Sequence, residues 1–168
     1  MKFMKTFSLV LIFVFFKSAI NAQVPASRYN MGKIFNDYIA IKNALADNDG
    51  TTVEVKANEL AALLAAQPDK GLNYSQWKFL ASHLGQLIDD SRSIGITSYV
   101  DKQRPFFAKL SKTMYTVLKG LKINTSPIYE QYCPVDKLHW LSETTTIKNP
   151  YHYTNDMKSC GKVVDTLK

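Results

Sequence analysis

The chain has 168 residues, of which 46% are hydrophobic and 21% are charged, and its formal net charge is +7. This length fits one domain with a single well-filled core. The lysines are scattered rather than gathered in a run, and part of the positive charge lies in the first 22 residues, so we expect no nucleic acid among the partners.

Residues 1–22 have the three parts of a secretory signal peptide. Lys2 and Lys5 precede an apolar run at residues 7–16, and a polar segment ends at Ala22. The apolar run is too short to span a bilayer. We therefore expect cleavage after Ala22, no membrane insertion afterwards, and an exported domain of residues 23–168 whose location is the periplasm.

Two segments follow in which apolar residues recur at helical spacing. The first begins near residue 27 and ends near Asp47, and its stripe includes Ile34 and Ile41. The second is predicted to begin at Thr51, which forms a capping box with Glu54, and to run to about residue 67. Its stripe is rich in alanine, so a neighbouring helix can approach closely.

Two longer helices are predicted next. Ser75 is the expected N-cap of the third, which ends at Gly95. The fourth is expected from about residue 97 to Lys122, with an irregular start because Pro105 cannot donate a backbone hydrogen bond. Four helices with short connections predict an up-down-up-down bundle. Its expected core consists of Ile34, Tyr38, Ile41, Leu60, Leu64, Trp77, Leu80, Leu84, Phe107, Leu110, Met114 and Leu118.

The helical pattern stops after residue 123. Residues 128–132 have the composition of a strand, residues 139–141 are placed to pair with it across a turn at Cys133 and Pro134, and residues 163–164 are a candidate third strand. The predicted fold is therefore mainly α, with residues 124–168 forming a small, loop-rich β cap added to the end of the bundle.

The predicted cap holds a cluster of soft and borderline metal ligands: Cys133, Cys160, Met157 and His152. Thiolate, thioether and imidazole groups select Cu(I) and, with less thioether, zinc. The alternative is a structural disulfide between Cys133 and Cys160, which would stabilise the domain by roughly 3 to 4 kcal/mol in the chain-entropy model. The sequence leaves both hypotheses open.

Enzyme signatures are missing from the sequence. It has no Gly-x-Ser-x-Gly, no glycine-rich phosphate loop and no His-Glu-x-x-His. Asp89 and Asp90 are adjacent and point in different directions on a helix, so we expect surface charges rather than an acid–base pair. His83, at the edge of the third helix, is expected to be a partly exposed structural residue. We therefore predict a protein that is not an enzyme.

Four short motifs in the last 40 residues carry a family resemblance. They are Tyr132-Cys133-Pro134, Trp140-Leu141-Ser142, Ile147-Lys148-Asn149-Pro150-Tyr151 and Met157-x-x-Cys160-Gly161. In this order they resemble an uncharacterised exported domain that occurs alone or at the C-terminal end of adaptor subunits of heavy-metal (copper or silver) efflux pumps. The resemblance implies a periplasmic helical domain associated with copper or related soft metals, with efflux-pump components as partners.

One departure from that family affects the ligand set. The family usually has methionine after Cys-Pro, where this chain has Val135, and His152 or His139 is the candidate replacement donor. The sequence thus favours an exported binding protein that holds Cu(I) through Cys133, Cys160 and Met157, with His152 as a weaker candidate. The alternative is a non-enzymatic protein-interaction module with a Cys133–Cys160 disulfide.

Overall fold

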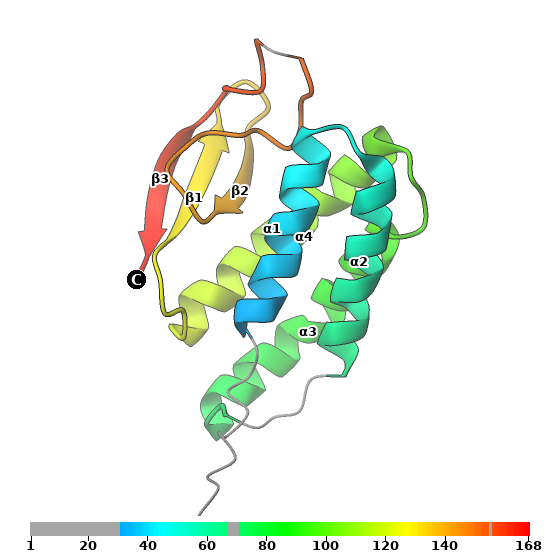
Figure 1. The fold of residues 1–168 in the computed structure, drawn as a ribbon. Helices are drawn as coiled ribbons and strands as arrows, with labels where there is room; N and C mark the ends of the chain where they lie inside the picture. Colours follow the sequence, from blue (N-terminus) through cyan, green and yellow to red (C-terminus); the bar gives the residue numbers. More distant parts are fainter. Residues whose placement is uncertain (1–30, 67–70, 155) are drawn as a thin grey trace, which may run out of the picture.

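Four helices and a three-stranded sheet make up the protein (Figure 1). The structure, a computed structural model, describes residues 31–66, 71–154 and 156–168. The elements are α1 (Met31–Ala46), α2 (Gly50–Ala65), α3 (Tyr74–Ile94), α4 (Val100–Leu121), β1 (Ile128–Cys133), β2 (Leu138–Ser142) and β3 (Lys162–Leu167). The predicted fold class, a helical bundle with a small C-terminal β element, is confirmed. The predicted signal peptide lies outside the described residues.

The helix ends are set by residues next to those predicted. Asp49 caps α2, because its side chain accepts a hydrogen bond of 3.0 Å from the backbone N–H of Thr52. Asn73 caps α3 in a capping box with Gln76. The predicted caps at Thr51 and Ser75 are therefore wrong, because an Asx residue slightly upstream satisfies the free N–H groups first.

Helix α4 differs from the prediction at its start. It begins at Val100, later than expected, and continues through Pro105 without interruption, so the predicted irregular start is wrong. Pro105 removes one backbone hydrogen bond from the early part of the helix. The helix ends at Leu121, and Lys122 follows in the left-handed conformation at φ 50°.

The predicted bundle core is mostly confirmed. All but two of the expected side chains are buried; Leu84 is half-buried and Trp77 is 43% exposed. Trp77 lies in the first turn of α3, where it stacks on Tyr74 with 6.4 Å between ring centroids. The helical spacing alone therefore places this tryptophan wrongly in the core.

The sheet is antiparallel with strand order β2-β1-β3. Tyr132 pairs with His139 in β2 and with Lys162 in β3, which confirms the predicted hairpin and the third strand. Figure 1 shows the sheet lying along the side of α1 and α4, and β2 contacts both helices. The predicted C-terminal β cap therefore packs along the side of these two helices.

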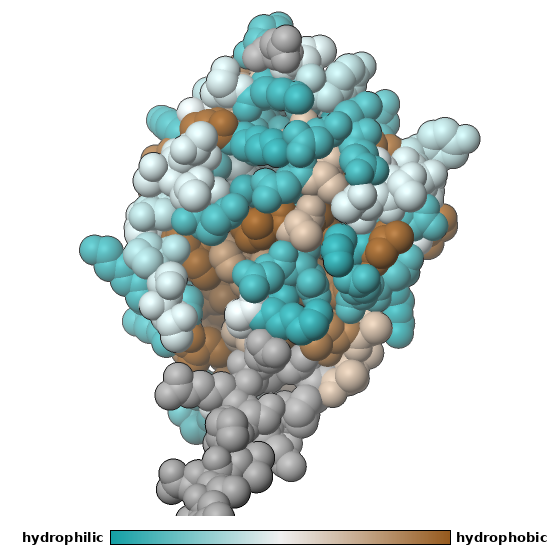
Figure 2. All heavy atoms as spheres, in the orientation of Figure 1, coloured by the Kyte–Doolittle hydropathy of each residue, from teal (hydrophilic) through white to brown (hydrophobic). Residues whose placement is uncertain are grey.

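The sheet and the helices share one hydrophobic core. Trp140 packs edge-on against Tyr151 at 6.0 Å between centroids, Tyr151 contacts Phe107 at 5.9 Å, and Phe107 stacks on Tyr38 at 5.2 Å. This chain of aromatic contacts runs from β2 through the β2–β3 connection to α4 and α1. On the face of the molecule seen in Figure 2, by contrast, hydrophobic residues form small patches separated by hydrophilic side chains.

Candidate metal centre

The two cysteines meet where β1 ends and β3 is about to begin. Cys133 is the last residue of β1, and Cys160 lies in a turn two residues before β3, where its N–H donates to the carbonyl of Met157 at 3.0 Å. Because β1 and β3 are neighbours in the sheet, this brings the two Cα atoms to 5.4 Å. Cys133 and Cys160 form a disulfide.

Asp136 is the residue of this site that sequence reasoning missed. It lies in the turn between β1 and β2, which the N–H of Lys137 closes on the carbonyl of Cys133 at 2.9 Å. One carboxylate oxygen of Asp136 and the two cysteine sulfurs lie within 4.8 Å of one another. The sequence signal that could have identified Asp136 is its position three residues after Cys133, in a tight turn.

His152 reaches the site through Asp136. Its Nε2 is 2.6 Å from Asp136 Oδ1, while Asn149 Nδ2 donates to Asp136 Oδ2 at 3.3 Å. The same Asn149 amide donates to the carbonyl of Cys160 at 3.4 Å. Asp136 is thus oriented by two side chains of the β2–β3 connection, in the manner of the outer groups that position ligands in metal sites.

The other predicted donors lie differently. Met157 is half-buried and packs against the hydrophobic core. His139 lies on β2, where its Nδ1 is 2.9 Å from Glu130 Oε1 and its ring contacts Tyr132. Val135 is 68% exposed. The structure therefore groups Cys133, Cys160, Asp136 and His152, and it gives His139 another set of contacts.

The candidates on α3 lie on a different element. His83 is half-buried, with Nδ1 2.9 Å from the carbonyl of Phe79, as expected of a structural histidine. Asp89 is exposed, but Asp90 is buried, so the prediction of surface charge is wrong for Asp90. Burial raises the pKa of the Asp90 carboxyl, while a hydrogen bond from Gln86 opposes this shift.

The redox state decides what chemistry this group allows. A disulfide supplies no thiolate, and thiolates are the form of cysteine that binds metals. Reduction would leave two thiols close to each other and to a carboxylate. Two sulfur donors with an oxygen donor, and a histidine in contact with that oxygen donor, suit zinc as well as copper.

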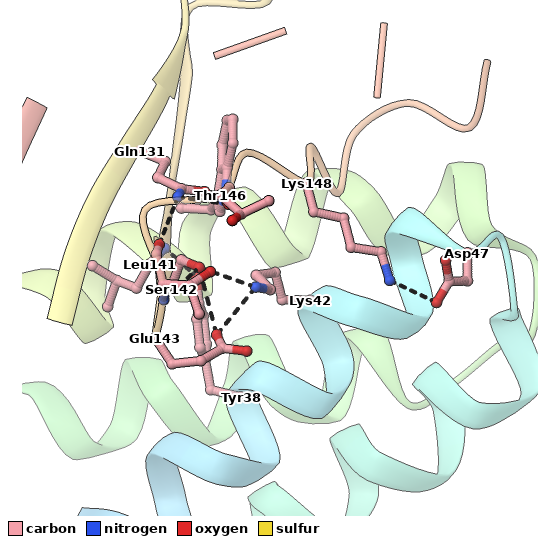
Figure 3. Close-up of polar contacts among 11 residues, drawn as sticks. Tyr38, Lys42, Asp47, Gln131, Leu141, Ser142, Glu143, Thr146 and Lys148 are labelled. Carbon is pink, nitrogen blue, oxygen red and sulfur yellow. Dashed lines mark hydrogen bonds and ion pairs between the residues drawn. The ribbon is translucent and has the colours of Figure 1, made fainter. Parts of the chain in front are cut away.

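A second polar cluster lies where α1 meets β2 (Figure 3). Tyr38 Oη is 2.7 Å from Ser111 Oγ and accepts from the N–H of Leu141 at 2.9 Å. Lys42 Nζ donates to Ser142 Oγ at 3.3 Å and lies 3.2 Å from Glu143 Oε2. Burial lowers the pKa of Lys42, partly offset by Glu143. Each group has a partner within the protein, so this cluster fixes the sheet on the helices.

Comparison with known proteins gives a family but no activity. No curated protein and no solved structure matches the chain. Within the described residues, no helix is long and apolar enough to cross a membrane. Residues 34–126 match the family described as "Protein of unknown function (DUF3347)", a match that covers all of α2, α3 and α4 and most of α1 and ends before the cysteines. The chain therefore belongs to the DUF3347 family.

Proposed function

We propose that this domain is an exported, non-enzymatic soft-metal-binding protein of the periplasm. Its metal is Cu(I) or a similar soft ion, held by Cys133 and Cys160 in their reduced form. The observation that carries the proposal is the convergence of both sulfurs and one Asp136 oxygen within 4.8 Å. The resemblance to domains of heavy-metal efflux adaptors supports efflux-pump components as partners that deliver or receive the metal.

The donor set supports this proposal in detail. The two Cα atoms, 5.4 Å apart, are close enough for both sulfurs to reach one ion. Asp136 is a harder oxygen donor, held by His152 and Asn149. With Val135 in place of methionine one thioether is lost, which shifts the preference of the site toward zinc. Met157 and His152 remain candidate ligands for an ion that moves them from their present contacts.

Metal binding requires a reductive step. A dithiol reductant supplies the two electrons and two protons that convert the Cys133–Cys160 disulfide into two thiols and is itself oxidised to a disulfide. A phosphine supplies the two electrons and becomes the phosphine oxide, while water supplies the oxygen and the two protons. Binding of the metal then displaces the thiol protons, so the affinity rises with pH. Cys133 is fully buried and Cys160 half-buried, so attack of a reductant on the Cys160 sulfur is expected first.

The experiment is a competition for Cu(I) between the protein, reduced with a phosphine, and a chromophoric chelator. Cys133→Ser and Cys160→Ser are each expected to lower the affinity by at least about a hundredfold, because removing a ligand exceeds the roughly 10- to 100-fold effect of outer groups. His83→Gln, on α3, is the matched control and should compete like the unmodified chain. Equal competition by both cysteine variants would rule out the site.

A second candidate function follows from the disulfide itself. With Cys133 and Cys160 oxidised, the domain is an interaction module whose C-terminal sheet is held in place for a partner protein. Export to an oxidising compartment supports this alternative. A thiol assay on protein unfolded and purified without reductant separates the two: two reactive thiols per chain contradict the module, and none means that metal binding depends on prior reduction.

A further inference from the structure

A groove of about 500 Å³ runs between α4 and the β1–β2 hairpin, separate from the disulfide. Its volume lies in the range of small-molecule sites, which is about 300 to 1,000 Å³. Ala108, Tyr115 and Leu138 give it half-buried apolar walls. The groove is therefore large enough and apolar enough to hold the body of a small organic molecule.

One wall carries a histidine held in a fixed position. His139 Nδ1 lies 2.9 Å from Glu130 Oε1, and the ring packs on Tyr132 with 4.5 Å between centroids. Glu130 is the only carboxylate among the residues that line the groove. The contact with His139 occupies one of its oxygens, and its side chain is only 13% exposed. The single carboxylate among the groove's lining residues is thus already in contact with His139.

Positive charge in the groove is not balanced in this way. Lys112 of α4 and Lys137 of the β1–β2 turn both line it and are exposed. In the described part of the chain neither ammonium group has a carboxylate within ion-pair distance, whereas Lys119, about two turns farther along α4 than Lys112, pairs with Asp165 at 3.0 Å. Two free ammonium groups beside an apolar wall match a ligand with an anionic head and an apolar body.

We propose that this groove binds a small amphipathic organic acid, with its carboxylate between Lys112 and Lys137 and its apolar body against Ala108 and Leu138. His139 contributes its second ring nitrogen to the same head group. This inference is independent of the metal proposal, because the groove is complete while the disulfide is intact. It assigns the domain a second ligand, and that ligand is organic.

The test uses the oxidised protein, octanoate as the probe and 1-octanol as its neutral counterpart. Two-dimensional ¹H–¹⁵N NMR should show octanoate shifting the amide signals of residues 108–116 and 137–141, with little effect of 1-octanol. Lys112→Gln and Lys137→Gln should each weaken binding about fivefold, the upper end for one exposed charge pair, and the double variant should weaken it further. Added salt should also weaken binding, because it screens exposed charges.

Lys78→Gln provides the matched control, since Lys78 is exposed on α3 and does not line the groove. It should bind octanoate like the unmodified protein. The proposal is overturned if octanoate does not bind, if 1-octanol binds equally well, if the shifted signals lie elsewhere, or if Lys78→Gln weakens binding as much as Lys112→Gln.

Discussion

The buried residues of α2 and α3 are mainly aliphatic, whereas α1 and α4 contact the sheet through buried polar groups as well as through the shared aromatic core. The buried residues of α2 and α3 include Leu60, Leu64 and Leu87. At the sheet, Tyr38 bonds to the backbone of Leu141 and Lys42 to Ser142 (Figure 3). Both regions exclude water. At the sheet the buried polar groups must also each have a hydrogen-bond partner, because burying an unpaired polar group costs free energy.

Arg104 of α4 makes a similar polar contact with the β2–β3 connection. Its Nε donates to the carbonyl of Pro150 at 3.2 Å, and Nη1 pairs with Asp101 at 2.6 Å. Such contacts are directional, so they fix where the C-terminal region lies on the helices. These contacts build residues 124–168 into the fold, although the family match ends at residue 126.

Removing the sheet should have the largest effect on stability. A chain ending at Lys122 would expose Tyr38 and Phe107 and leave Arg104 Nε without the Pro150 carbonyl. The lost burial is comparable to the whole stability of a small domain, about 5 to 15 kcal/mol. We expect weak helical signal in far-ultraviolet circular dichroism and no cooperative thermal transition.

A chain ending at Leu167 is the control for that truncation, because it lacks only the exposed Lys168 and should unfold like the full chain. Cooperative melting of the shorter chain would show that the helices form an independent unit. That outcome would mean that residues 123–168 can be removed without unfolding the bundle.

The disulfide should have the next largest effect. The double variant Cys133→Ala, Cys160→Ala removes a cross-link between residues 27 apart, which in the chain-entropy model is worth roughly 3 to 4 kcal/mol. Urea unfolding should show a loss of this size. The unmodified protein in a phosphine reductant should lose a similar amount, and a loss below about 1 kcal/mol in both would mean that the hydrogen bonds alone hold the sheet.

The helices and strands could be predicted from the sequence, because burial follows their spacing. Ile34, Leu60 and Phe107 lie on faces that the periodicity indicates, and the hairpin follows from the turn at Pro134. The position of the sheet could not be predicted. It depends on contacts such as Tyr38 with Leu141, 103 residues apart, and hydroxyl and ammonium groups carry no periodic signal.

The candidate site shows the same limit. The sequence indicated Cys133, Cys160, Met157 and His152 as residues with metal-binding groups. The fold joins the two cysteines, whereas His152 contacts Asp136 beside them and Met157 packs against the core. Asp136 was missed because a single aspartate in a turn is common. Its place in the site depends on the approach of His152, which lies in the middle of the β2–β3 connection, a segment with no helix or strand among its described residues.

Tyr38→Phe tests the polar contact with a smaller change. It leaves the N–H of Leu141 and the hydroxyl of Ser111 without their partner, at an expected cost of about 1 to 3 kcal/mol in urea unfolding. Tyr115→Phe is the matched control, because the Tyr115 hydroxyl binds Asp165 near the surface, and it should cost less than about 1 kcal/mol. Equal losses would mean that the buried hydrogen bonds of Tyr38 stabilise the protein no more than the hydrogen bond of Tyr115 near the surface.

The smallest expected effect concerns Asp90, the polar group on α3 that breaks the pattern of paired burial. Its Oδ2 has no hydrogen-bond partner among the described residues, and burial raises the pKa of its carboxyl. A carboxyl whose pKa is higher in the folded state stabilises the fold when protonated, below its unfolded pKa of about 4, and this contribution is lost as the pH rises through the folded value. Asp90→Asn should therefore raise the free energy of unfolding at pH 7 by up to about 1 kcal/mol.

The pH dependence distinguishes this cause from a simple packing change. As the pH falls through the raised pKa of Asp90, the unmodified protein becomes neutral at this position and the advantage of Asp90→Asn should disappear. Asp89→Asn removes the same charge from the exposed neighbour and should change stability by less than about 0.5 kcal/mol at either pH. If Asp90→Asn and Asp89→Asn raise the free energy of unfolding equally at pH 7, the gain comes from the change in net charge. Burial of the Asp90 carboxyl would then carry no cost, and α3 would not differ in this respect from the contact with the sheet.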